Sequence, residues 1–342
     1  MRALQVLALS LSLPLSACVG LAADDTFGRS DSESGGVEGS ICLPNAVSGV
    51  SEAVVSVFID EDADGLADGE TADATTVTDL DGTFVFEDLT AGSYVAVASR
   101  GHFSHTFPFT FIAGNRAELT PECLAPDEVN ITQVTGSCDN PKLLLERVGF
   151  DVTTMDNTGQ DWLDLLTNAN DIDDVDVLLL PCGLPEDWLP QAQTVTSVVG
   201  QWLENGGSLY VSGTAWPLVE TLDEEAIDFL RDDTDFDAPE VGFANTLNAR
   251  IADTGLAAHF TEGTASIRLA DNFPVLESVG GSALALVDAT VSTVDFETVE
   301  SSPLAVSRPT DDGGTLVYSV FGTTGESTED MEALLLEMLL NL

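Results

Sequence analysis

Positively charged residues are scarce in this sequence, and their scarcity excludes several classes of partner. The 342 residues contain 10 Lys plus Arg against 59 Asp plus Glu, for a formal net charge of −49, and Lys142 is the single lysine. A surface this negative repels phosphate backbones and anionic lipid headgroups, so nucleic acid is excluded as a partner. Cations, basic proteins and a saline setting that screens self-repulsion suit the chain better.

The apolar run at residues 3–17 is too short to cross a bilayer and is typical of a secretory signal. It ends at Leu15-Ser16-Ala17-Cys18, which resembles the lipobox of bacterial lipoproteins. The resemblance implies that Cys18 is lipidated and anchors the mature chain to a membrane, whereas the alternative is an ordinary signal peptide with an incidental Cys. Val19 stands where Asp would mark inner-membrane retention. This implies delivery to the outer membrane or cell surface.

The composition predicts a multidomain fold. Hydrophobic residues make up 44% of the chain and the mean hydropathy is +0.16, and disorder requires low hydrophobicity as well as high charge. The length suits two ordinary domains, each with its own core. We expect the signal and lipobox at 1–18, a flexible acidic tether at 19–36, a β-sandwich at 37–125 and an α/β domain at 128–342.

The two domains differ in the period of their apolar residues. In the first, short alternating strands predict an N-terminal all-β sandwich; they cover 53–59, 75–79, 83–89, 93–99 and 105–114. In the second, strands alternate with helices, which predicts a C-terminal doubly wound α/β domain; its main strands cover 129–136, 151–156, 175–183, 208–213 and 313–322. Among the less regular segments we expect a helix at 222–233, strands at 282–289 and 302–308, and a final helix at 329–342.

Four cysteines remain after Cys18, and an even number in an exported chain predicts two disulfides. Three pairings are possible. The domain division favours Cys42–Cys123 in the sandwich and Cys138–Cys182 in the α/β domain.

The stretch FIDEDADGLADGE, at residues 58–70, contains Asp60, Asp62, Asp64, Gly65 and Asp68. Oxygen ligands at alternate positions, with glycine at the sharp turn, are what Ca²⁺ requires. A full EF-hand needs Glu at its twelfth position, where this chain has Thr71, so we expect a shorter loop completed by Asp68 or Glu70. The alternative is a solvated acidic loop with no bound ion.

Residues 78–94, TDLDGTFVFEDLTAGSY, resemble carboxypeptidase-regulatory-like and Cna-B or SdrD-B-like modules. The resemblance implies a prealbumin-like sandwich that serves as a spacer, stabiliser or ligand-binding unit and is rarely an enzyme. Independently, Asp81-Gly82 suits a hairpin turn, and Phe84 and Phe86 share one face of a strand. His102 and His105 lie three apart on a strand, so they point to opposite faces and predict no metal site.

Four segments of the second domain resemble the class I glutamine amidotransferase-like, flavodoxin-like superfamily. They are VTGSCDNP (134–141), DVLLLPCG (176–183), ENGGSLYVSG (204–213) and GGTLVYSVFG (313–322). Active members carry a Cys nucleophile on the elbow that corresponds here to 212–216, which has no Cys. Thr214 needs a base, and His259 is the single His of this domain. The resemblance therefore leans against an enzyme.

The remaining candidates in the α/β crevice have two interpretations each. Cys182 is a nucleophile at the end of a core strand, or it is oxidised to a disulfide with Cys138, which the exported setting favours. Trp188 and Trp216 line a crevice that stacks a sugar or peptide, or they pack the loops.

The sequence thus favours a cell-envelope lipoprotein, stabilised by Ca²⁺, that binds a ligand, an envelope protein or a polysaccharide without catalysing a reaction. The alternative is an extracytoplasmic hydrolase or carbohydrate-processing enzyme with Asp or Glu as acid and base in the same crevice. Two carboxylates or His259 within reach of Ser212 or Thr214 would favour the enzyme, and a crevice without convergent titratable groups would favour binding.

Overall fold

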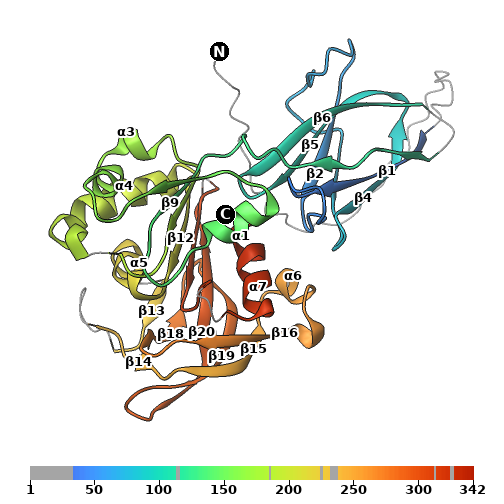
Figure 1. The fold of residues 1–342 in the computed structure, drawn as a ribbon. Coiled ribbons are helices and arrows are strands. Elements are labelled where there is room, and N and C mark those ends of the chain that lie inside the picture. Colours follow the sequence, from blue (N-terminus) through green and yellow to red (C-terminus); the bar gives the residue numbers. More distant parts are fainter. Residues whose placement is uncertain are drawn as a thin grey trace, which may run out of the picture.

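The computed structural model describes residues 34–112, 116–184, 186–223, 226–231, 238–311, 313–323 and 327–342. The predicted signal, Cys18 and residues 19–33 of the tether lie outside these ranges. β-Strands dominate the described chain and form several sheets (Figure 1). Residues 34–36, which we assigned to the tether, instead begin the first strand, because the backbone of this Gly-rich stretch pairs with β4.

Two four-stranded sheets form the N-terminal lobe. The first contains β1 (Ser34–Cys42), β4 (Thr83–Thr90), β7 (Ala117–Glu118) and β8 (Glu122–Cys123). The second runs in the order β3 (Ala74–Val77), β2 (Val54–Ile59), β5 (Gly92–Arg100) and β6 (Phe103–Phe111). Buried side chains of both sheets, among them Val37, Val57, Phe84 and Phe103, join one apolar core. Alternation along β4 turns Phe84 and Phe86 to that core, as expected.

The C-terminal lobe is built on a nine-stranded sheet of mixed direction. Its parallel part runs in the order β10 (Val152–Met155), β9 (Ile131–Val134), β11 (Val177–Leu180), β12 (Ser208–Ser212) and β21 (Thr315–Ser319). Its antiparallel part continues through β20 (Thr298–Pro309), β19 (Leu284–Ser292), β15 (Asn245–Ile251) and β16 (Thr264–Leu269). All four residues of β9 and of β11 are buried, as in a parallel sheet covered on both faces.

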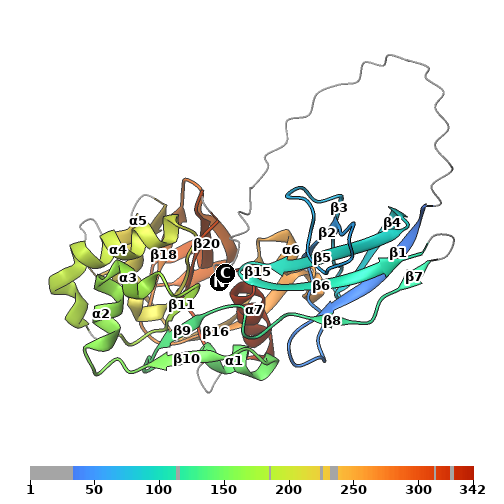
Figure 2. The ribbon, with the colours of Figure 1, turned by 90° about the horizontal axis from the view of Figure 1, so that it is seen from above.

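Helices cover the parallel strands on both faces (Figures 1 and 2). One group contains α1 (Lys142–Val148) and α7 (Glu329–Leu339), and the other α2 (Asp161–Thr167), α3 (Ala169–Ile172), α4 (Ala192–Glu204) and α5 (Trp216–Asp223). The short helices are α6 (Thr254–Ala257), η1 (Glu186–Gln191), η2 (Gly213–Ala215) and η3 (Thr261–Gly263). None of the helices in the described ranges combines the length and apolarity needed to cross a bilayer.

The predicted helix at 222–233 is wrong. α5 ends at Asp223, and β13 (Ile227–Phe229) pairs with β18 (Leu276–Val279), about fifty residues further along the chain. A second small pair joins β14 (Val241–Gly242) to β17 (Phe273–Pro274). These strands form through tertiary pairing. Partners this distant along the chain leave no periodic signal in the local sequence, so the sequence did not predict them.

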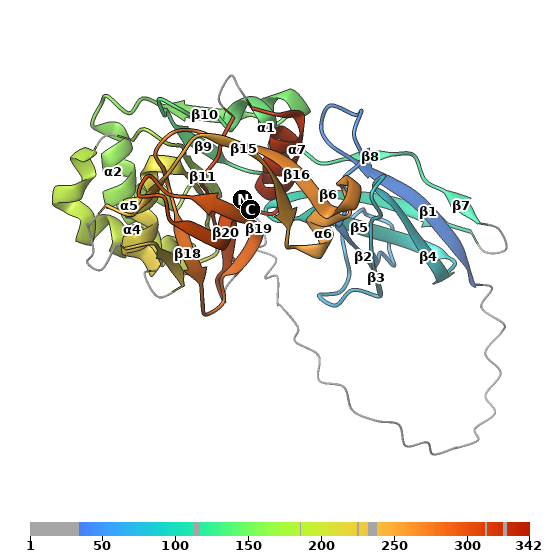
Figure 3. The same ribbon diagram turned by 90° about the horizontal axis from the view of Figure 1, so that it is seen from below.

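The C-terminal helix lies between the two lobes. Figure 3 shows α7 and α6 beside β5 and β6 of the sandwich. The last residue, Leu342, is buried, and its carbonyl accepts a hydrogen bond from the backbone N–H of His102 at 2.6 Å. The end of the chain therefore fastens the large sheet to the β5–β6 turn.

Candidate functional site

The first candidate site is the crevice at the carboxyl ends of β9, β11 and β12, where open α/β sheets bind their ligands. Asp139 is buried there and follows β9. Its carboxylate accepts hydrogen bonds from Ser212 Oγ (2.7 Å), Tyr210 OH (3.2 Å) and Thr323 Oγ1 (2.7 Å). It also accepts the backbone N–H groups of Thr323 (2.6 Å) and Asn140 (2.8 Å). Protein donors thus satisfy both oxygens of Asp139.

The two tyrosine hydroxyls of the crevice stay protonated. Burial, together with the charge of Asp139, raises the pKa of Tyr210 well above its ordinary value. Burial likewise raises the pKa of Tyr318, whose hydroxyl donates to the Gly213 carbonyl at 2.9 Å. Both tyrosines therefore act as hydrogen-bond donors and supply no base at neutral pH.

Glycine occupies the elbow that follows β12. Gly213 has φ +50°, the left-handed conformation of a sharp strand-to-helix turn. A Cβ at this position would lie 2.9 Å from Cys182 Cβ, so the disulfide fills the space that a nucleophilic side chain would need. Thr214 Oγ1 is held differently, as the acceptor of the Gly183 N–H at 3.0 Å. Ser212 Oγ accepts the Cys182 N–H at 3.0 Å and donates to Asp139.

Both disulfides join the pairs that the domain division favours. Cys42 and Cys123 connect β1 and β8, with 4.3 Å between their Cα atoms. Cys138 and Cys182 connect the segments that follow β9 and β11, with 5.5 Å between Cα atoms. The Cys182 sulfur is therefore bonded, which removes it as a free thiol nucleophile.

The two tryptophans expected in the crevice differ in exposure. Trp188 is buried. Trp216 is half-buried at the start of α5, and its ring lies 5.7 Å from that of Phe229. Trp188 is therefore covered by protein, whereas part of Trp216 stays accessible to solvent.

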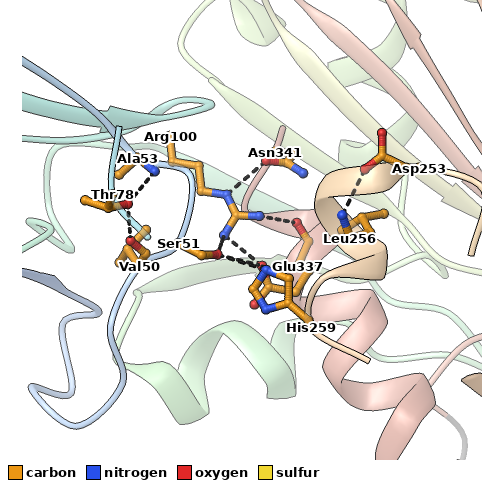
Figure 4. A network of polar contacts seen from close by, with 10 residues as sticks. All are labelled: Val50, Ser51, Ala53, Thr78, Arg100, Asp253, Leu256, His259, Glu337 and Asn341. Carbon is orange, nitrogen blue, oxygen red and sulfur yellow. Dashed lines mark hydrogen bonds and ion pairs between the residues drawn. The ribbon is translucent and has the colours of Figure 1, made fainter. Parts of the chain in front are cut away.

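His259 belongs to a network between the lobes and not to the crevice (Figure 4). Its Nε2 lies 3.1 Å from Ser51 Oγ and 3.7 Å from Glu337 Oε2. Arg100, whose side chain is 2% exposed, pairs with Glu337 at 2.8 Å. It also donates to Ser51 Oγ at 3.1 Å and to Asn341 Oδ1 at 2.9 Å. The sequence held no signal for this network, because its members are distant along the chain.

Ser51, His259 and Glu337 have the composition of a hydrolytic triad but a different geometry. In a triad the acid orients the imidazole through the nitrogen opposite the nucleophile. Here Ser51 and Glu337 both contact Nε2, and Arg100 donates to the serine oxygen. Ser51 is also 2% exposed. The network can fasten the lobes together, but it cannot present a nucleophile to a substrate.

The second candidate site is the acidic loop after β2. It brings together carboxylate oxygens of Asp60, Asp62 and Asp68, all within 4.8 Å of one another. Asp60 is buried and accepts the backbone N–H groups of Asp64 (3.1 Å) and Gly65 (3.0 Å). Gly65 has φ +84°, the conformation that the turn requires.

Asp64, the fourth predicted ligand, is oriented differently. Its carboxylate accepts the Leu66 N–H at 2.9 Å within its own turn. Asp68 Oδ2 accepts the Glu61 N–H at 2.5 Å. Three hard oxygen donors on a loop held by backbone hydrogen bonds match the chemistry of Ca²⁺.

The two sandwich histidines have separate partners. His102 Nε2 lies 3.1 Å from Ser208 Oγ, and burial lowers the pKa of the ring. His105 Nε2 lies 3.3 Å from Glu122 Oε2. His102 lies in the β5–β6 turn and His105 lies in β6, so the two do not share a strand as the sequence suggests.

No family model and no curated protein matches this chain. A putative GMP synthase protein from Thermoplasma acidophilum is 8% identical, with a TM-score of 0.41 over 62% of this chain and 94% of that one. A DUF3823 family protein from Parabacteroides merdae is 12% identical, with a TM-score of 0.22 over 28% of this chain and 48% of that one. The Bacillus anthracis TIE protein is 14% identical, with a TM-score of 0.21 over 26% of this chain and 16% of that one. This chain thus spans less than half of the latter two proteins, and no argument rests on similarities this low.

Proposed function

We propose that this chain is an exported, lipid-anchored envelope protein whose α/β lobe binds a ligand or partner and does not catalyse a reaction. Cys18 is the anchor, and the sandwich is a calcium-stabilised spacer of the carboxypeptidase-regulatory-like, prealbumin-like type. The second lobe is a degenerate flavodoxin-like, amidotransferase-like domain. Numbered along the chain, its parallel strands run 2-1-3-4-5, the flavodoxin order, which supports this assignment.

The observation that carries the non-catalytic role is the elbow after β12. A glycine stands at the strained position, the Cys138–Cys182 disulfide occupies the space beside it, and Asp139 is satisfied by protein donors. Acyl transfer needs an accessible nucleophile beside a base. Ser212 donates to Asp139, but Ser212 is buried and the Asp139 carboxylate accepts four further donors. Neither Ser212 nor Thr214 has a histidine partner among its hydrogen bonds.

The test of this role is turnover of p-nitrophenyl esters and glycosides by the purified, oxidised protein. We expect no turnover above a Ser212→Ala variant. Turnover that the wild type shows and S212A loses would establish the hydrolase instead. Mass spectrometry of the mature chain tests the anchor separately: a diacylglyceryl group on Cys18 is expected, and an N-terminus cleaved without lipid would contradict the anchor.

Calcium is tested by thermal unfolding with Ca²⁺ or with a chelator. A concentration of about 100 times the dissociation constant stabilises the folded state by roughly 2.7 kcal/mol. We expect Asp62→Asn to abolish this gain and Asp64→Asn to keep most of it, because the Asp64 carboxylate faces its own turn. Equal melting temperatures with Ca²⁺ and chelator would leave the loop as an acidic turn.

A further inference from the structure

Two phenylalanines form an exposed pair on the antiparallel part of the large sheet. Phe296, in the β19–β20 hairpin, is 85% exposed, and Phe243, after β14, is 40% exposed. Their ring centroids lie 5.6 Å apart. This hairpin extends at the end of the large sheet away from the sandwich (Figure 1). Aromatic rings this exposed lose the stabilisation of burial, so their position calls for another explanation.

Backbone hydrogen bonds hold the two segments that carry the pair. Phe296 has φ +62°, a conformation that is unusual for a bulky residue. Its N–H donates to the Thr293 carbonyl at 3.0 Å, and the Val294 N–H donates to Val241 at 2.9 Å. The Phe243 N–H donates to the Ser292 carbonyl at 3.2 Å. Preorganised aromatic rings of this kind bind a partner with little loss of conformational entropy.

A small apolar hollow adjoins Phe243. It has a volume of about 70 Å³ and is lined mainly by Phe243, Leu247, Leu269, Phe273 and Val291. Pockets for drug-sized ligands measure roughly 300–1,000 Å³. This hollow therefore suits a single aliphatic side chain.

The charges around the two phenylalanines favour a positively charged partner. Arg231 contacts three carboxylates, those of Glu240 (3.1 Å), Asp295 (3.3 Å) and Glu297 (2.5 Å), so the cluster keeps a net negative charge. Asp271 adds a further carboxylate, which accepts the N–H of Ala244 beside the hollow at 2.9 Å. Anionic lipids and a second copy of this acidic chain are repelled, and Lys or Arg side chains are attracted.

We propose that Phe243, Phe296 and the adjoining hollow, here called the aromatic platform, bind a peptide segment of a basic partner protein. One aliphatic side chain of the segment fills the hollow, and flanking Lys or Arg side chains meet the aromatic faces and the carboxylates. The platform goes beyond the proposed function in naming a partner surface apart from the crevice and the acidic loop. It rests on that function only for its extracytoplasmic setting.

The test uses a fluorescein-labelled peptide, Lys-Gly-Lys-Leu-Lys-Gly-Lys, in fluorescence anisotropy titrations of the full chain. We expect saturable binding that weakens at least tenfold for Phe296→Ala and for a peptide with Ser in place of Leu, since central aromatic contacts exceed about 1.4 kcal/mol. Ile112→Ala, which removes another exposed apolar side chain on the sandwich, is the matched control and should leave the affinity unchanged.

Several outcomes would overturn the platform. Absence of binding at about 1 mM protein would do so. Equal affinity of the wild type and F296A would also do so, because the peptide would then bind only through the general negative charge of the surface. Sedimentation that shows a wild-type dimer lost in F296A would assign the surface to self-association. Thermal melts of the same samples show whether each variant is folded. Melts with and without Ca²⁺ test the acidic loop separately from peptide binding.

Discussion

Gly213 is constrained both by its backbone conformation and by a close neighbouring side chain. Its φ of +50° lies in the left-handed region, and a Cβ would meet Cys182 Cβ at 2.9 Å. Gly313 also has a positive φ, +97°, but among the residues that the structure describes no atom beyond its chain neighbours lies within 4 Å of its would-be Cβ. Alanine substitutions at Gly213 and Gly313 therefore separate the free-energy cost of the left-handed conformation from the cost of the contact with Cys182.

We expect Gly213→Ala to lower the free energy of unfolding by about 3 kcal/mol and Gly313→Ala by about 1 kcal/mol. Left-handed strain acts in both variants, whereas only G213A forces the disulfide to move. Urea denaturation of the oxidised proteins measures both losses. Equal losses would show that the Cys138–Cys182 disulfide does not fill the elbow.

For single residues, the sequence predicts which side chains lie close together better than it predicts where each side chain points. Asp60, Asp62 and Asp68 come together as their spacing suggests, because alternate residues of a short loop stay close. Asp64 turns to the Leu66 N–H, a choice between two nearby partners that spacing alone does not decide. The contact of Arg100 with Glu337 was beyond prediction, because it joins residues 237 positions apart that share no motif.

At the scale of elements, the free edge of the large sheet is covered by a helix. β16 ends the strand order, and its Ser266 N–H donates to Asp330 at 2.7 Å. Thr328 Oγ1 donates to the Ser266 carbonyl at 2.5 Å and accepts the Met331 N–H at 3.1 Å as the N-cap of α7. The first turn of α7 thus caps its own helix and blocks further strand pairing.

Asp330→Ala should lower the free energy of unfolding by about 1–2 kcal/mol and speed hydrogen exchange at Ser266, because a charged acceptor is lost. Glu329→Ala removes the same charge from the same turn, and its side chain is exposed. We expect a loss within about 0.5 kcal/mol for this control. Equal exchange rates at Ser266 in the two variants would contradict the protecting role of Asp330.

The elements that the sequence predicts well are those with strong local periodicity. The strand expected at 53–59 is β2, Val54–Ile59, and the helix expected at 329–342 contains α7, Glu329–Leu339. The strands expected at 282–289 and 302–308 are β19 and β20, whereas β13, β15 and β16 have no counterpart among the expected strands. β13 pairs with β18, and β15 pairs with β16 and β19, so the register of these strands depends on partners outside the local sequence.

At the scale of the molecule, the two lobes meet through a buried ion pair. Arg100 and Glu337 belong to different lobes, and their side chains are 2% and 18% exposed. Removing one partner leaves a desolvated charge, whereas replacing both by apolar groups is often neutral. Arg147 and Glu332 form an exposed pair at 2.7 Å, with side chains 57% and 35% exposed, and provide the comparison.

We expect Arg100→Met to destabilise the protein by about 3 kcal/mol, and the R100M/E337M double variant to regain most of this loss. Arg147→Met should change the stability by less than about 1 kcal/mol. Urea denaturation of the wild type, R100M, E337M, R100M/E337M and R147M measures these values. Strictly additive losses for R100M and E337M would show that the two charges act independently across the interface.

Acid lability tests the same interface through His102. The ring lies against Ser208 of the other lobe, and burial lowers its pKa below the ordinary 6.5, although Asp176 opposes the shift. The unfolded chain therefore binds this proton at a higher pH than the folded chain does. By linkage, the stability due to neutral His102 is complete above 6.5 and decreases as the pH falls through 6.5 toward the folded-state pKa.

His102→Gln should remove this decrease. Protonation of the 59 acidic residues also changes stability in acid, so the informative quantity is the difference between variant and wild type at each pH. We expect that difference to shift in favour of H102Q from about pH 7 to about pH 5 at constant ionic strength. His105→Gln, which changes a residue of β6 that lies beside Glu122, should keep the wild-type decrease. Parallel curves for H102Q and wild type would mean that the interface admits a protonated imidazole, and the two lobes would then be joined less tightly than the buried contacts of His102 and Leu342 require.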